Sequence, residues 1–192
     1  LDGLATDVPA EARRLAEAFW PGGLTLILHA QPSLDWDLGE TKGTVALRIP
    51  ADDVAQDLLT LTGPLAVSSA NRTGQPAAQT AADAEAQLAE SVEVYLEGGP
   101  RPAEGADALP STIVDGTAVP LRVVRQGAIS LERLREVVPG VLGVGEEPAA
   151  VETPATPEQT AATPDSASDS KAPGSTTPDS TGAPAVDETP RN

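Results

Sequence analysis

The sequence predicts an α/β or α+β domain followed by a disordered tail. Short apolar runs typical of strands alternate with segments whose apolar residues recur at helical spacing, and short polar links separate them. All four aromatic residues lie before position 96, whereas the chain from Val144 onward has eight prolines, nine acidic residues and two basic ones. Such a composition buries too little apolar surface to offset the entropy of ordering. We therefore expect a folded domain over 1–143 and an acidic, Pro/Ser/Thr-rich disordered tail over 144–192.

The first half of the domain is predicted to contain two helices and three strands. One helix follows Asp7, its N-cap, and stops at the Trp-Pro-Gly-Gly segment 20–23. A second helix begins after Asp52 as N-cap and runs through Leu61. Apolar, β-branched runs predict strands over 24–29, 44–49 and 64–67.

The second half is predicted to contain two more helices and three more strands. Thr80 caps a helix that reaches Leu88, and Ser130 caps the last helix. Residues 92–96 alternate apolar and acidic side chains, as a half-buried strand does. Residues 112–114 and 119–124 are predicted to form a hairpin.

Several residue types are absent, which narrows the class of protein. The chain has no Cys and a single His, so disulfides, thiolate metal sites and histidine-based metal sites are not expected. No apolar run approaches the roughly 20 residues that span a bilayer, and no signal segment opens the chain. We expect a soluble, cytoplasmic protein without a membrane partner. The chain starts with Leu1 and contains no Met, so we expect a fragment of a longer protein.

Three polar segments are candidates for ligand binding. The loop 69–74 (SANRTG) follows a predicted strand and offers hydroxyl, amide and backbone donors, although the same residues also make ordinary turns. Arg48 lies in an apolar strand, where it either pairs with a carboxylate or phosphate or points to solvent. Ser111 and Arg125 flank the predicted hairpin, where they form either a donor and cation close together or the plain ends of a surface hairpin.

Five motifs in sequence order resemble the signatures of the YrdC/Sua5 family. They extend from residue 19 to residue 129, and the tail has no counterpart in the family. The motifs are FWPGGLTLIL at 19–28 (family FWPGPLT), VALRIP at 45–50 (VAxRxP), PLAVSSANRTG at 64–74 (PLxxxSANxSG), STIVD at 111–115 and VRQGAI at 124–129 (xRxGxI).

The resemblance implies a twisted open α/β sheet with flanking helices and a concave ligand cleft. It implies an L-threonylcarbamoyladenylate synthase, a nucleotidyltransferase that joins L-threonine, bicarbonate and Mg²⁺-bound ATP to give threonylcarbamoyl-AMP and pyrophosphate for t6A37 modification of tRNA. tRNA, double-stranded RNA and other proteins of the t6A pathway are the further partners that it implies. By position in the motifs, the nucleotide ligands are Thr44, Asn71, Thr80 and Arg125, and the threonine ligands are Arg48, Ser69 and Ser111.

The sequence departs from the family pattern in ways that leave alternatives open. The family's Lys-x-Arg segment, which grips the phosphates, has no counterpart, because Lys42 and Lys171 are the only lysines; we expect no pyrophosphate release by these residues alone. Gly23 replaces a usual Pro, and one extra residue precedes Thr80. Residues 1–143 carry 20 acids and 10 bases, which argues against strong nucleic-acid binding.

Two other classes of protein share this fold. One is a non-enzymatic, YciO-like protein that binds nucleotide or RNA. The other is the related domain of hydrogenase-maturation carbamoyltransferases, which sits in a longer chain with zinc fingers and therefore with Cys, which is absent from this sequence.

Overall fold

The computed structural model describes residues 1–101 and 109–148. The predicted disorder of the tail falls outside these residues from position 149 onward and stays a prediction. Within the described part, none of the helices combines the length and the apolar character needed to cross a membrane.

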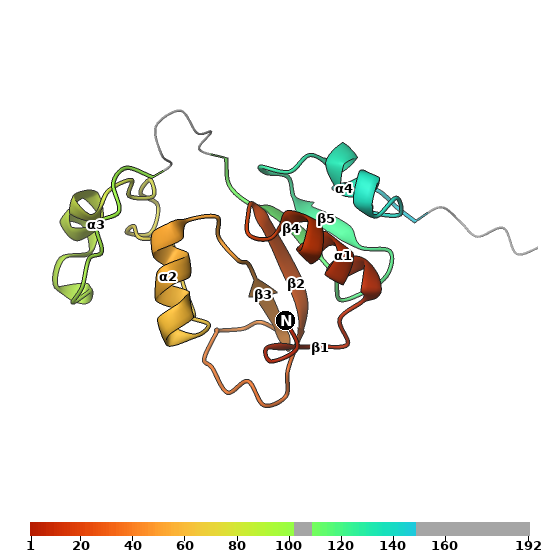
Figure 1. Cartoon of the computed structure of the whole chain (residues 1–192), viewed down its shortest axis with the longest axis horizontal. Coiled ribbons are helices and arrows are strands. Elements are labelled where there is room, and N and C mark those ends of the chain that lie inside the picture. The colour runs from red at the N-terminus through yellow and green to blue at the C-terminus, as the bar shows by residue number, and fades with distance from the viewer. Residues whose placement is uncertain (102–108, 149–192) are drawn as a thin grey trace, which may run out of the picture. The chain divides into compact units, whose positions relative to one another are not determined.

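A five-stranded mixed sheet is the centre of the fold (Figure 1). Its central strand β2 pairs in parallel with β4 and antiparallel with β1 and β3, and β4 continues into an antiparallel pair with β5. This is the open α/β sheet that the sequence predicts, with one short strand, β1, that it did not predict. The strands are β1 (Ala5–Thr6), β2 (Leu24–Ala30), β3 (Thr44–Leu47), β4 (Thr112–Asp115) and β5 (Arg122–Arg125).

One face of the sheet is covered by the helices α1 (Ala10–Phe19) and α4 (Leu131–Val137) (Figure 1). Alternate residues of β2, Leu24, Leu26 and Leu28, are fully buried against this layer. Because side chains of a strand alternate between its two faces, the residues between these leucines lie on the other face of the sheet. The packing thus decides which side chains remain available for a ligand.

Helix caps are largely where the sequence predicts them. α2 (Asp53–Thr62) begins after Asp52, whose carboxylate accepts from the Ala55 N–H, and α3 (Ala81–Leu88) begins after Thr80. The hydroxyl of Ser130 caps α4 in the same way. The predicted cap of α1 is wrong, because Asp7 adopts a φ of 50° and Pro9, which has no capping side chain, occupies the N-cap position.

The strands predicted over 64–67 and 92–96 are wrong. In the described part of the chain, neither segment has a hydrogen-bonded partner strand, and a single 3₁₀ turn over 89–91 precedes the second segment. Val67 is 87% exposed and Val94 is 70% exposed. An alternating pattern shows which side chains a strand could bury, but a strand also needs a neighbour that accepts and donates its backbone hydrogen bonds. Residues 64–67 form an apolar run and residues 92–96 alternate, but in the described part of the chain neither segment has such a neighbour.

Candidate functional site

Four polar residues lie at one end of the sheet, on the face opposite α1 and α4. They are Thr25, Arg48, Ser111 and Arg125. β2 and β4 run in parallel and begin at this end, whereas β3 and β5 run antiparallel to them and finish there. Leu26 pairs with Leu47, so the same antiparallel register continued by one residue sets Thr25 opposite Arg48. Ile113 of β4 pairs with Thr25 of β2 and with Arg125 of β5, which places these side chains on the same face of the sheet, away from α1 and α4.

Ser111 and Arg125 are in direct contact at this end. The Arg125 guanidinium donates to the Ser111 carbonyl from Nε at 3.1 Å and from Nη2 at 2.8 Å, and Nη2 also donates to Ser111 Oγ at 3.0 Å. The structure therefore brings together the donor and the cation that the sequence predicts to be close in space. Because the carbonyl holds Arg125 by two nitrogens, the orientation of the guanidinium plane is fixed before any ligand binds.

A buried threonine and a glycine support this contact from below. Thr112 is fully buried, and its hydroxyl donates to the Ile129 carbonyl at 2.7 Å while accepting from the backbone N–H groups of Gly127 and Ile129. A Cβ at Gly127 would lie 2.2 Å from the Pro110 carbonyl oxygen, so only glycine fits this close approach of two backbones. The turn after β5 is therefore held firmly against the start of β4.

Arg48 is exposed at the end of β3. Its Nε donates to the Gly22 carbonyl at 2.9 Å, and the Gly22 N–H donates to the Ile49 carbonyl at 2.8 Å. Within residues 1–101 and 109–148, Arg48 makes no ion pair. Arg48 is therefore exposed, and its backbone anchor through Nε leaves both terminal nitrogens able to bind an anion such as a carboxylate or phosphate.

Ser69 and Thr80 line a separate open cleft of about 650 Å³, between α2, α3 and the segments around 67–70 and 92–99. The Thr80 hydroxyl accepts from the Asp83 N–H at 3.1 Å, so its hydrogen remains free for a ligand. Asn71 lies in the same loop as Ser69. Its amide donates to the carbonyls of Arg72 and Gln75 at 3.0 Å each, which leaves its side-chain oxygen as the atom that can meet a ligand.

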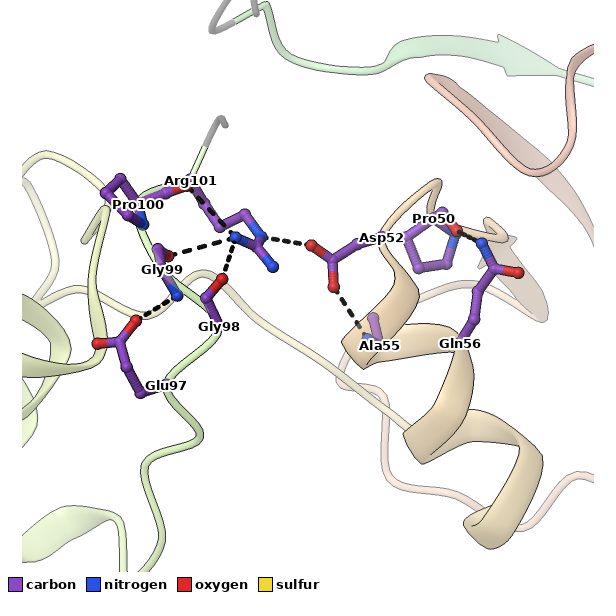
Figure 2. A network of polar contacts seen from close by, with 9 residues as sticks. All are labelled: Pro50, Asp52, Ala55, Gln56, Glu97, Gly98, Gly99, Pro100 and Arg101. Carbon is purple, nitrogen blue, oxygen red and sulfur yellow. Dashed lines mark hydrogen bonds and ion pairs between the residues drawn. The ribbon is translucent and has the colours of Figure 1, made fainter. Parts of the chain in front are cut away.

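An ion pair that the sequence did not predict lies at the edge of this cleft (Figure 2). Arg101 is paired with the carboxylate of Asp52, and its Nη1 also donates to the carbonyls of Gly98 and Gly99. The N–H of Ala55 and the Arg101 guanidinium hold the pKa of the Asp52 carboxyl below its ordinary value. Asp52 thus both caps α2 and holds the segment 98–101.

Thr44 is the predicted site residue that the structure sets apart from Arg48. It pairs with His29 at the opposite end of β3, and its hydroxyl donates to the Thr41 carbonyl at 2.8 Å. Thr44 and Arg48 are four positions apart along an extended chain, which corresponds to about 13 Å between their Cα atoms. No hydrogen bond in the described residues joins the sheet-end group to Thr44 or to the cleft residues. A ligand that touches all of the predicted residues therefore has to be extended.

Thr25 is a site residue that the sequence analysis missed. Its hydroxyl donates to Ser111 Oγ at 2.8 Å, between the two arginines of the sheet end. The available signal was a polar residue at an odd position within the apolar run of β2, which alternation places on the exposed face.

The donor set of the described residues does not form a metal centre of its own. These residues contain no group of three or more His, Asp or Glu side chains close enough to hold an ion. Mg²⁺ prefers a few carboxylates together with phosphate oxygens, and the described residues supply no such carboxylate group.

An open mixed sheet with helices on one face and two arginines at one end of the other defines an α/β protein with a candidate ligand site on that face. The model of the Sua5/yciO/yrdC family, which is described as telomere recombination, matches residues 1–127, and the chain belongs to this family. A putative threonylcarbamoyl-AMP synthase of Mycobacterium leprae is 49% identical over 138 residues, which are 72% of this chain and 61% of that protein. The Pyrococcus abyssi threonylcarbamoyl-AMP synthase is 34% identical over 72% of this chain and 40% of its own length.

Solved structures agree with this relationship. The crystal structure of P. abyssi Sua5 complexed with L-threonine matches with a TM-score of 0.65 and 32% identity, covering 73% of this chain and 40% of that one. E. coli YciO matches with a TM-score of 0.59 and 25% identity, covering 69% of this chain and 63% of that one. The chain spans about three fifths of the length of the mycobacterial relatives that it matches.

Proposed function

We propose that this protein forms threonylcarbamoyl-AMP. In this reaction L-threonine, bicarbonate and ATP give threonylcarbamoyl-AMP, pyrophosphate and water, and the product serves t6A37 modification of tRNA in the cytoplasm. The observation that carries the proposal is that Arg48 lies at the same end and on the same face of the sheet as the contacting pair Ser111 and Arg125. Relatives that bear the name of this enzyme, and a solved relative complexed with L-threonine, support it.

The threonine is proposed to bind through Arg48, Ser69 and Ser111. The free terminal nitrogens of Arg48 suit the bidentate geometry of a carboxylate, whereas Ser111 and Ser69 offer hydroxyl groups. Such a site holds the threonine amine in place for bicarbonate and lowers the entropic cost of bringing the reactants together.

The nucleotide is proposed to bind through Arg125, Asn71, Thr80 and Thr44. Arg125 is already held by the Ser111 carbonyl, so it can place a fixed positive charge beside the phosphates, where charge develops as pyrophosphate leaves. The side-chain oxygen of Asn71 and the hydroxyl of Thr80 can bind ribose or base donors and acceptors. Mg²⁺ enters this proposal with ATP, and the proposed further partners are tRNA, double-stranded RNA and other t6A-pathway proteins.

The direct test incubates the native gene product with L-threonine, bicarbonate and ATP and looks for threonylcarbamoyl-AMP by mass spectrometry. A second test uses the 192-residue chain itself, because the proposed threonine ligands all lie in its described part. We expect calorimetry to detect binding of L-threonine and of ATP, and no change of L-threonine affinity when double-stranded RNA is added.

If the protein has a YciO-like function, the same binding experiments should give a different result. A non-enzymatic nucleotide- or RNA-binding protein would bind ATP or double-stranded RNA without binding L-threonine. That result, together with the absence of product from the native protein, would exclude the synthase.

A further inference from the structure

We infer that Thr25 is a positioning residue that turns the hydroxyl hydrogen of Ser111 toward the amino-acid ligand. The inference deepens the proposed function and rests on it. Thr25 Oγ1 donates to Ser111 Oγ at 2.8 Å, although the two residues are 86 positions apart in the sequence. Thr25 is the last residue of the motif that resembles FWPGPLT and Ser111 is the first of STIVD, and the pairing of β2 with β4 brings the two together.

The hydrogen-bond inventory of Ser111 carries the argument. A serine hydroxyl has one hydrogen to donate and two lone pairs that accept. Ser111 Oγ accepts from Thr25 Oγ1 and from Arg125 Nη2, at 2.8 and 3.0 Å, so both lone pairs are engaged. Its own hydrogen must then point away from both donors. Ser111 is thereby converted into an obligatory donor, and the ligand atom that meets it has to be an acceptor, such as a carboxylate oxygen of the amino acid.

Thr25 is well suited to hold this arrangement. Its side chain is β-branched and therefore stiff about χ1, so its hydroxyl keeps one direction. The strand register also places it between Arg48 on β3 and Ile113 on β4, with Ser111 two residues before Ile113. Without the Thr25 hydroxyl, Ser111 regains an empty lone pair and can rotate, and part of the binding free energy is then lost to ordering it.

A purely structural role for the hydroxyl does not fit the contacts around it. The backbone ladder between β2 and β4 already extends from the Leu24–Thr112 pair to the Ile27–Asp115 pair, and Thr25 is only half-buried. Valine has nearly the same shape as threonine and a higher preference for strands. Replacing Thr25 with valine should therefore leave the sheet in place while removing the donor.

The experiment measures the affinity for L-threonine and for ATP by calorimetry in the 192-residue chain. We expect Thr25→Val to weaken L-threonine binding about tenfold and ATP binding less than about twofold, the former being the effect of one lost hydrogen bond. Thr25→Ser, which keeps the hydroxyl, should bind within about twofold of the wild type. Thr117→Val is the matched control, since it removes a threonine hydroxyl that bonds to Asp115 at the other end of β4.

A double-mutant cycle tests whether Thr25 acts through Ser111. In a Ser111→Ala background, Thr25→Val should weaken L-threonine binding no further, because the hydroxyl that Thr25 orients is gone. Thr25→Ala supplies a second variant without the hydroxyl in case valine disturbs the packing.

The outcomes separate this inference from the function on which it rests. Equal L-threonine affinity of wild type and Thr25→Val, an equal loss in Thr25→Ser, or an undiminished loss in the Ser111→Ala background would each overturn the positioning role alone. A wild-type chain that binds no L-threonine would overturn the proposed function and the positioning role together.

Discussion

At the scale of single residues, Arg48 and Arg125 are both arginines at one end of the sheet, but they are anchored differently. Arg125 is held by the Ser111 carbonyl through two nitrogens, whereas among the described residues Arg48 is held through Nε alone, by the Gly22 carbonyl. Arg48 is therefore the more adaptable of the two and suits a small, freely arriving ligand, whereas Arg125 suits a charge whose position has to be fixed.

Replacing each arginine with alanine should separate their roles. We expect Arg48→Ala to weaken L-threonine binding about 10- to 150-fold, the effect of losing a charge-assisted hydrogen bond of about 1.5–3 kcal/mol, with a much smaller effect on ATP. Arg125→Ala should show the opposite preference. Calorimetric titrations with each ligand provide the measurement, and Arg14→Ala is the control, because Arg14 is an exposed arginine on α1. Two silent substitutions, or two that weaken ATP binding alone, would contradict the assignment of threonine to Arg48.

The close packing around Gly127 predicts the effect of a substitution there on the free energy of unfolding. A methyl group at this position would meet the Pro110 carbonyl at 2.2 Å, so the turn after β5 has to move away from β4. We expect Gly127→Ala to lower the free energy of unfolding by about 1–3 kcal/mol, the usual range for overpacking. Gly140→Ala is the control, because nothing lies within 4 Å of a Cβ at Gly140. Urea titrations of both variants measure the difference, and equal midpoints would contradict the close approach.

At the scale of elements, the sequence predicted those that depend on local signals. The caps at Asp52, Thr80 and Ser130 were predictable because a short polar side chain before an amphipathic run satisfies free N–H groups nearby. The segments 64–67 and 92–96 were mispredicted because pairing depends on a partner strand that local pattern cannot reveal.

The candidate site also contains contacts that local sequence predicts and contacts that depend on distant segments. Ser111 and Arg125 were predicted to be close because they flank one hairpin, and the structure confirms this contact. Thr25 was missed because its partner is 86 residues away, and the Asp52–Arg101 pair was missed because it joins positions 49 apart. The ligands themselves follow from the family resemblance and not from the pattern of the residues.

The Asp52–Arg101 pair predicts that the stability of the folded protein depends on pH through Asp52, the N-cap of α2. The pKa of Asp52 is lowered in the folded protein, so its contribution to stability is present above the ordinary aspartate pKa of about 3.9 and is lost as the pH falls through the folded value. Asp52→Asn keeps a good capping residue and removes the charge. We expect thermal unfolding midpoints of wild type and Asp52→Asn to differ near pH 7 and to converge below about pH 4. Asp57→Asn, an exposed acid on the same helix, should show no such convergence.

Asp52→Ala should be more harmful than Asp52→Asn, because it removes the cap as well as the charge. Loss of a cap of this kind costs about 0.5–2 kcal/mol. Urea titration at pH 7 measures the loss, and equal unfolding midpoints for the alanine and asparagine variants would contradict the capping role of Asp52.

At the scale of the whole molecule, apolar side chains are exposed on the extended segments near the cleft. Val67 and Leu65 on one segment and Val94 and Leu96 on the other are 44% to 87% exposed. Exposed apolar groups that are close together promote association and dye binding, whereas single ones do not.

Charged substitutions on these segments should therefore change the solution behaviour of the chain. We expect Val67→Lys combined with Val94→Lys to lower the fluorescence of a hydrophobic dye and to reduce self-association in sedimentation velocity. Val144→Lys is the control, because Val144 is 63% exposed but lies apart from these segments in the sequence. An equal effect of the control would show that the reduction comes from net charge alone.

The contact between Thr25 and Ser111 also has a consequence for the time course of folding. When two strands that are far apart in the sequence pair, a large loop has to close first. The entropy of loop closure is lost before the contacts contribute favourable free energy, so such contacts form slowly. Because β2 meets β4 only after the intervening chain has been arranged, the proposed amino-acid site cannot exist in a nascent or half-folded molecule. Refolding followed by stopped flow should therefore regain L-threonine binding later than helical circular dichroism, which would make ligand capture a marker for the last step of chain assembly.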